Sequence, residues 1–178
     1  MSKKIALVTG ATSGIGRATA QALAKEGFDI IMTGRRQDRL EDLAKNLQSS
    51  FPIQTLPLAF DIRNRSEVEE KLEQLPTNWK KIDVLINNAG LASGLNHFDE
   101  GSIEDWERMI DTNVKGLLYI TRTLAPQMVR RKEGHIINIG STAGKEVYEK
   151  GNVYCATKHA VDALTKGMRI DLLKHNIK

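Results

Sequence analysis

Apolar segments of strand length alternate along this chain with segments whose apolar residues recur at helical spacing. The alternation begins with the apolar run 5–8 and the helical pattern that follows it as far as residue 27. Strands that alternate with helices form parallel βαβ units, and the crossover helices cover both faces of the sheet. The pattern therefore predicts an α/β fold with a doubly wound parallel sheet. Because no linker or internal repeat interrupts it, residues 1–178 are interpreted as one domain.

The same pattern gives the order of the elements. Strands are predicted at residues 5–8, 28–33, 54–60, 82–86 and 135–139, and helices at 15–27, 38–48, from 66, from 103 and at 152–174. Pro52 and Pro57 favour an edge position for the third strand, because proline cannot donate to a hydrogen-bond ladder. Ser66 and Ser102 are interpreted as helix N-caps. Pro126 is expected to kink or end the long helix that contains it.

Composition excludes several classes of protein. A hydrophobic fraction of 40% and a charged fraction of 27% fit one soluble globular domain. The single cysteine, Cys155, leaves no internal disulfide, and the four histidines show no ligand spacing, so no metal site is expected. The formal net charge of +4 is dispersed among acidic residues, so nucleic acid is not an expected partner. No segment has the apolar length of a signal peptide or a membrane span, which predicts a cytoplasmic protein without membrane contact.

The turn after the first strand is the first candidate site. It reads Thr9-Gly10-Ala11-Thr12-Ser13-Gly14-Ile15-Gly16 and leads into a helix. Such glycines let a pyrophosphate approach the backbone at a helix N-terminus, although a glycine-rich turn alone also fits a simple tight turn. The spacing departs from Gly-x-Gly-x-x-Gly and matches Thr-Gly-x-x-x-Gly-x-Gly, so the chain here resembles the short-chain dehydrogenases/reductases. The expected cofactor contacts in this turn are Gly10, Thr12, Ser13, Gly14, Ile15 and Gly16.

Four further matches follow in the order of that family. They are Asp61, Asn87-Asn88-Ala89-Gly90, Asn113, and Ser141 followed by Tyr154-Cys155-Ala156-Thr157-Lys158. Taken singly, each also fits a turn, a cap or a surface residue. Together they resemble the classical members of the family, which implies a Rossmann-type fold and a nicotinamide dinucleotide cofactor. By this resemblance Asp61 and its neighbour Ile62 bind the adenine end, Asn88 supports the cofactor, and Asn113 helps to hold a water relay.

Tyr154 and Lys158 are four residues apart, so on a helix they share a face. A nearby ammonium favours the phenolate form of a tyrosine, which suits Tyr154 for general acid–base catalysis. Tyr154 would accept the alcohol proton during oxidation and return it during reduction. The resemblance adds Ser141, which with Tyr154 binds the substrate oxygen, and a contact between Lys158 and the nicotinamide ribose.

Arg35 and Arg36 follow the second strand, where enzymes specific for NAD carry an acidic residue for the ribose hydroxyls. No acid stands there. Two guanidinium groups, with Ser13 in reach, suit a 2′-phosphate, so NADP is the predicted cofactor. A solvated arginine pair is the alternative.

Within the family the chain is most similar to the bacterial NADP-dependent 3-hydroxy acid dehydrogenases, also described as serine or allo-threonine dehydrogenases. This implies hydride transfer between NADP and a small 3-hydroxy acid or its 3-oxo acid. Residues 145–150 depart from the pattern of that group, and Lys145 and Lys150 are the nearby cations for a substrate carboxylate. The alternatives are a 3-oxoacyl thioester reductase, a sugar or steroid dehydrogenase, and a non-catalytic NADP-binding protein.

The family implies two further expectations. Its members continue with another parallel strand, a Pro-Gly loop and a lid, so we expect the domain to be incomplete at its C-terminus, where residues 176–178 resemble the start of a strand. A homo-oligomer, a dimer or tetramer, is also implied. The last helix carries a stripe of small residues at Ala156, Ala160, Ala163 and Gly167. Close packing of this stripe on the sheet is preferred to a subunit contact.

Overall fold

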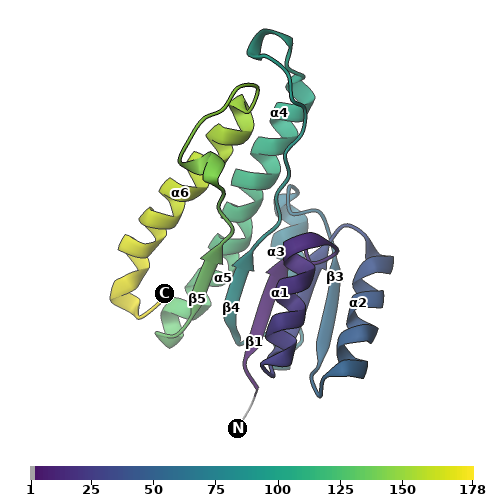
Figure 1. The fold of residues 1–178 in the computed structure, drawn as a ribbon. Coiled ribbons are helices and arrows are strands. Elements are labelled where there is room, and N and C mark those ends of the chain that lie inside the picture. Colours follow the sequence, from purple (N-terminus) through teal and green to yellow (C-terminus); the bar gives the residue numbers. More distant parts are fainter. Residues whose placement is uncertain (1–2) are drawn as a thin grey trace.

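The computed structural model describes residues 3–178, which form a five-stranded parallel sheet with helices on both faces (Figure 1). The strands are β1 (Ile5–Thr9), β2 (Asp29–Gly34), β3 (Thr55–Ala59), β4 (Ile82–Asn87) and β5 (His135–Asn138). The helices are α1 (Gly14–Lys25), α2 (Gln37–Ser50), α3 (Arg65–Glu73), α4 (Ile103–Ile110), α5 (Leu117–Arg131) and α6 (Asn152–Leu172). The doubly wound α/β prediction is confirmed.

The strand order is β3-β2-β1-β4-β5, so the chain reverses its direction of winding between β1 and β4. In open α/β sheets, ligands bind in the crevice at the carboxyl ends of the strands where this reversal occurs. The order also confirms the edge position of β3, where Pro57 is paired with Met32.

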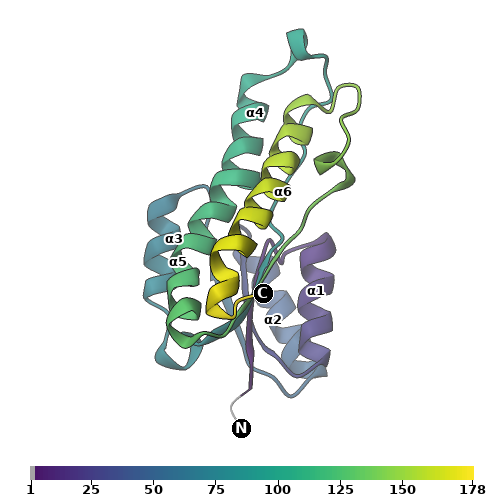
Figure 2. The same cartoon turned by 90° about the vertical axis from the view of Figure 1, so that its left-hand side faces the viewer.

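Alternate residues of the strands fill two hydrophobic cores. In β1, Ile5 and Leu7 face one core while Ala6 and Val8 face the other. The first core lies under α3 and α5, and the second lies under α1 and α2. The two views show these layers, with α4 and the first half of α6 projecting beyond the sheet (Figures 1 and 2).

The predicted cap at Ser66 is wrong, and of the two outcomes predicted for Pro126 the end of the helix is not found. The N-cap of α3 is Asn64, whose side chain accepts hydrogen bonds from the amides of Ser66 and Glu67, so Ser66 lies inside the helix. An asparagine two residues earlier caps the helix, so the capped amides are those of Ser66 and Glu67. Pro126 does not end α5, which continues to Arg131 because Leu124 and Met128 are buried on either side of it. The predicted cap at Ser102 is confirmed, since its hydroxyl accepts from the amide of Asp105 at 3.2 Å.

The exposure of α6 corrects the expectation about its small residues. Cys155, Thr157, Lys158 and Val161 are the buried residues of this helix, whereas Ala156 and Ala163 are exposed. A β-carbon added at Gly167 would meet no atom within 4 Å. Ala156 and Ala163 therefore lie on the outer surface of α6, Ala160 and Gly167 are half-buried, and the stripe does not form a packed face against the sheet.

The last residues of the chain lie beside β5. Ile177 forms a parallel bridge with Gly134, and the amide of Ile136 donates to the carbonyl of Lys178 at 2.8 Å. The predicted start of another strand is confirmed. Over residues 3–178, no helix combines the length and the hydropathy that crossing a bilayer requires.

Candidate active site

The glycine loop after β1 is shaped by close packing against the loop after β4. Gly10 has φ +66°, and a β-carbon there would lie 2.9 Å from the Cα atom of Ala89. The side-chain amide of Asn88 donates to the carbonyls of Thr9 and Gly10 at 2.9 and 3.2 Å. In return, the Thr9 hydroxyl accepts from the amides of Asn88 and Ala89, both at 3.0 Å. Asn88 therefore fixes the two loops in one arrangement.

The N-terminus of α1 points its free amides toward this loop. Ser13 precedes the helix, and its side chain makes no capping hydrogen bond. Gly14 has φ +53°, with open space where a β-carbon would lie. Unpaired amides and the helix dipole together favour an anion at this position.

Gly16 plays a packing role, although the sequence predicted a cofactor contact. A β-carbon at Gly16 would lie 2.3 Å from the Asn88 Nδ2 atom and 2.5 Å from the Gly10 carbonyl oxygen. Gly16→Ala is expected to lower the free energy of unfolding by about 2 kcal/mol, because this backbone cannot move aside. Urea denaturation measures the change. The matched control is Gly167→Ala on the open side of α6, which should stabilise the protein by up to about 1 kcal/mol. A stabilising Gly16→Ala change would contradict the packing role.

The loops that follow all five strands line one cavity of about 600 Å³. The lining includes every predicted cofactor residue except Gly16; its residues are 10, 12–15, 34–36, 60–63, 88–92, 112, 139, 140, 154 and 158. The cavity lies at the carboxyl ends of the strands and extends from Arg36 to Tyr154. Its size and length suit a dinucleotide.

Basic side chains line one end of this cavity. The Arg36 guanidinium donates to the Thr12 hydroxyl at 2.7 Å and to the Ser13 hydroxyl at 3.4 Å, so it is held against the glycine loop. Arg35 lies beside it in the lining. Charge-assisted hydrogen bonds from two guanidiniums suit a phosphate group. The residues present therefore fit a dinucleotide with a phosphate on its ribose.

Asp61 lies in the same part of the cavity, where Arg63 covers its carboxylate. Nε and Nη2 of Arg63 donate to this carboxylate at 3.0 and 2.6 Å. Partial burial alone would raise the pKa of Asp61, but the hydrogen bonds and charge of Arg63, together with the charge of Arg35, hold it below its usual value. Asp61 is therefore ionised and able to accept hydrogen bonds at neutral pH. Arg63 was not predicted as a site residue, and its only signal in the sequence is its position two residues after Asp61.

Tyr154 and Lys158 project from the first turns of α6 into the other end of the cavity. Lys158 is only 8% exposed, and its ammonium donates to the Ile139 carbonyl at the end of β5 at 2.9 Å. Burial lowers the pKa of Lys158. A buried ammonium is thus fixed one helical turn from the Tyr154 ring.

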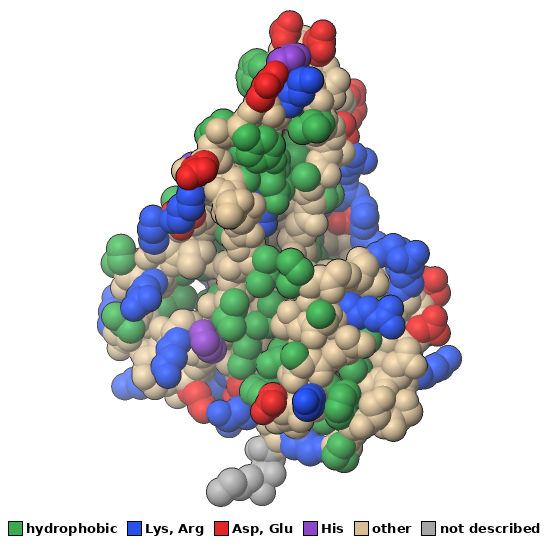
Figure 3. All heavy atoms as spheres, in the orientation of Figure 1, with side chains coloured by type: hydrophobic (Ala, Val, Ile, Leu, Met, Phe, Trp, Pro, Cys, Tyr) green, Lys and Arg blue, Asp and Glu red, His purple; other side chains and the backbone are tan. Residues whose placement is uncertain are grey.

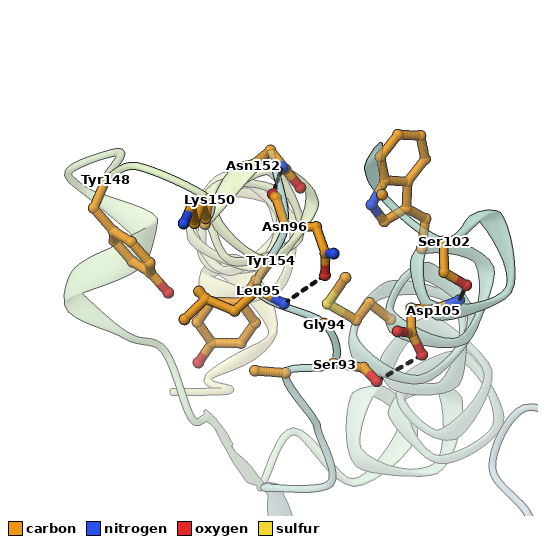
Figure 4. A pocket seen from close by; sticks show the side chains of 15 residues that line it. Ser93, Gly94, Leu95, Asn96, Ser102, Asp105, Tyr148, Lys150, Asn152 and Tyr154 are labelled. Carbon is orange, nitrogen blue, oxygen red and sulfur yellow. Dashed lines mark hydrogen bonds between the residues drawn. The ribbon is translucent and has the colours of Figure 1, made fainter. Parts of the chain in front are cut away.

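A second, smaller pocket of about 50 Å³ adjoins the large cavity, and Ala92 and Tyr154 line both. Its walls are the loop 92–96, the start of α4, and residues 148–152 before and at the start of α6. In Figure 4, Tyr154 lies on the side of Tyr148 and Lys150, and Ser93 and Asp105 lie opposite. Tyr154 therefore faces a compartment that is separate from the dinucleotide-sized one.

Asn113 and Ser141 line neither cavity. Asn113 is 2% exposed and lies in a π-helical turn, Asp111–Gly116, between α4 and α5. Its side chain exchanges two hydrogen bonds with the backbone of Leu91, both at 2.8 Å, and donates to the Thr157 hydroxyl at 3.0 Å. It thereby ties the loop after β4 to α6. The Ser141 hydroxyl accepts from the amide of Ala143 at 3.2 Å, so the role of Ser141 toward a substrate stays a prediction.

The fold, the glycine loop and the residues on α6 define the class of protein. The chain matches the short chain dehydrogenase family over residues 4–178 and belongs to this family. The resemblance stated from the sequence is confirmed.

Two curated proteins are similar in sequence to this chain over most of its length. It is 51% identical over 168 residues to the NADP-dependent 3-hydroxy acid dehydrogenase YdfG of Escherichia coli K12, a match that covers 94% of this chain and 66% of that protein. It is 45% identical to a probable NADP-dependent dehydrogenase of Haemophilus influenzae, over 100% of this chain and 69% of that one. The chain thus spans about two thirds of the length of these curated relatives.

Solved structures agree with the sequence comparison. Serine dehydrogenase from Escherichia coli superposes with a TM-score of 0.89 at 49% identity, covering 94% of this chain and 76% of that chain. The closed form of serine dehydrogenase complexed with NADP⁺ gives a TM-score of 0.90 at 49% identity, covering 94% of this chain and 66% of that chain.

Proposed function

We propose that this protein is an NADP-dependent oxidoreductase that interconverts a small 3-hydroxy acid, such as a serine-like acid, and its 3-oxo acid. The observation that carries the proposal is the position of Tyr154, whose side chain lines both the dinucleotide-sized cavity and the small pocket. A group that transfers a proton to a substrate beside a bound nicotinamide must touch both compartments. The relatives named as 3-hydroxy acid and serine dehydrogenases support the substrate class.

The choice of NADP rests on the basic end of the large cavity. Arg36, held by Thr12 and Ser13, and its neighbour Arg35 would bind the 2′-phosphate. The free amides at the start of α1 would bind the pyrophosphate, and Asp61 with Ile62 would hold the adenine end. Tyr154 and Lys158 would then lie at the nicotinamide end.

The protein's own residues supply the acid–base chemistry. When bound, the nicotinamide ring accepts a hydride from the alcohol carbon or returns one to the carbonyl carbon. Tyr154 takes the alcohol proton during oxidation and protonates the forming alkoxide during reduction. The buried Lys158 ammonium, held by the Ile139 carbonyl one helical turn from Tyr154, would bind the nicotinamide ribose. Ser141 is proposed to orient the substrate oxygen, and Asn113 positions the loop and helix on which these groups lie.

The size of the small pocket favours a short substrate. At about 50 Å³ it suits a compact hydroxy acid better than a long acyl thioester or a steroid. A 3-oxoacyl thioester reductase is therefore the less favoured alternative.

Initial rates of NADPH formation test the proposal. We expect turnover with serine, allo-threonine and 3-hydroxyisobutyrate, and slower reduction of a 3-oxoacyl thioester. NADP binding without turnover of any hydroxy or carbonyl substrate would support a non-catalytic nucleotide-binding protein instead. Faster turnover of the thioester than of the three acids would support the reductase.

We also propose a homo-oligomer, a dimer or tetramer. The exposed small residues of α6 allow close approach of another helix. A monomeric mass in analytical ultracentrifugation would contradict this proposal.

A further inference from the structure

Lys150 adopts an unusual backbone conformation at the edge of the small pocket. Its φ is +64°, in the left-handed region that favours glycine and disfavours a lysine side chain. It lines the pocket together with Tyr154 (Figure 4). Non-glycine residues held in this region are concentrated at ligand sites. The strained position places a long cationic side chain beside the proposed acid–base residue.

Asp105 and Lys150 are the charged residues of the pocket lining, and Asp105 has partners, as does the nearby Lys145. Lys145, the second candidate partner for a substrate carboxylate, forms an ion pair with Asp162 of α6 at 2.7 Å. Asp105 accepts from Arg108 and Ser93. Glu149, next to Lys150, lies 3.6 Å from His97. Within residues 3–178, Lys150 forms no ion pair. Its ammonium charge is therefore available to a ligand in this pocket.

The walls around Lys150 are polar and fixed. The Asn152 side chain at the start of α6 donates to the Asn96 carbonyl at 3.1 Å and so joins the two sides of the pocket. The Tyr148 ring packs over Gly151, where a β-carbon would lie 2.4 Å from a ring carbon. Figure 4 shows Lys150 between Tyr148 and Asn152. An anion at this position would meet an ammonium and amide and hydroxyl donors, with no unpaired carboxylate opposite it.

We propose that Lys150 binds the carboxylate of the substrate and so selects 3-hydroxy acids over neutral alcohols. This inference rests on the proposed function and names the residue that confers its substrate class. In a 3-hydroxy acid one carbon separates the carboxylate carbon from the hydroxyl carbon. Lys150 and Tyr154 line the same pocket of about 50 Å³, so the two ends of such a molecule can be held together.

The substitution Lys150→Gly tests the proposal without straining the backbone. Loss of one charge-assisted contact should raise KM for 3-hydroxyisobutyrate by about 10- to 100-fold, with kcat changed less than about 3-fold. KM for the methyl ester of the same acid should not change, because the ester carries no charge. Lys150→Arg should restore much of the affinity for the acid. The unfolding midpoint of Lys150→Gly should rise, which separates a lost contact from a damaged fold.

The matched control is Lys145→Ala, which removes a nearby cation that Asp162 already neutralises. KM for the acid should stay within about 2-fold of the original value in this variant. An unchanged KM in Lys150→Gly, with the unaltered protein active on the acid, would overturn the role of Lys150 alone. If the unaltered protein oxidises the ester but none of the acids, both this inference and the proposed function are overturned.

Discussion

Replacing Tyr154 with phenylalanine is expected to lower kcat for NADPH formation from 3-hydroxyisobutyrate by about 10³-fold. The substitution removes the hydroxyl that exchanges the substrate proton and keeps the ring that forms the wall between the two cavities. The affinity for NADPH, measured by fluorescence titration, should therefore change less than about 3-fold. A large loss of kcat with nearly unchanged affinity for NADPH would identify the hydroxyl as the reacting group.

The matched control for Tyr154→Phe is Tyr119→Phe. Tyr119 lies on α5, packs partly buried against the core and lines neither cavity. Tyr119→Phe removes the same atom from a position outside both cavities. The kcat of this variant should therefore remain near the original value. Equal rates for Tyr154→Phe and the unaltered protein would refute the acid–base assignment.

The double substitution Arg35→Ala and Arg36→Ala is expected to weaken NADP binding by about 10² to 10³-fold. The expected loss reflects two charge-assisted contacts to a phosphate, one of them from a guanidinium that Thr12 and Ser13 hold in place. NAD has no phosphate at this position, so its affinity should change less than about 3-fold. Isothermal titration with each dinucleotide measures both effects.

A third arginine provides the control for charge alone. Arg122→Ala removes an exposed cation from α5, away from the cavity lining, and should leave both affinities unchanged. If NAD binds the unaltered protein as tightly as NADP and the double substitution affects neither, the preference for NADP is wrong.

Neighbouring residues along the chain explain why much of the architecture was predictable. The strand-and-helix alternation depends on side-chain periodicity, and Pro57 limits β3 to an edge because of its own covalent structure. The glycine loop runs without interruption from the end of β1 into α1, and Tyr154 and Lys158 lie within α6, so the spacing of both motifs is local. The two local predictions that failed also depend on residues that are neighbours in the sequence. Asn64 caps α3 two residues before Ser66, and buried neighbours outweigh the helix-ending effect of Pro126.

Contacts between segments that are distant in the sequence decided the features of the structure that were not predicted. The π-helical turn at Asn113 was not predicted, because the side chain of Asn113 is fixed by Leu91 and Thr157 from two other segments. The expectation that the small residues of α6 pack on the sheet failed, because small residues fit a packed surface and an exposed one equally well.

By itself, the sequence determined the parallel α/β fold, the family and the candidate residues of the proposed cofactor and acid–base sites. Only the tertiary structure distinguished Lys145, neutralised by Asp162, from Lys150, which is held at positive φ beside Tyr154. The physical reason is that the charge available to a ligand depends on ion pairs formed across the fold. The position of Tyr154 between two cavities was likewise decided by the tertiary structure, since the larger cavity forms only where loops after five separate strands meet.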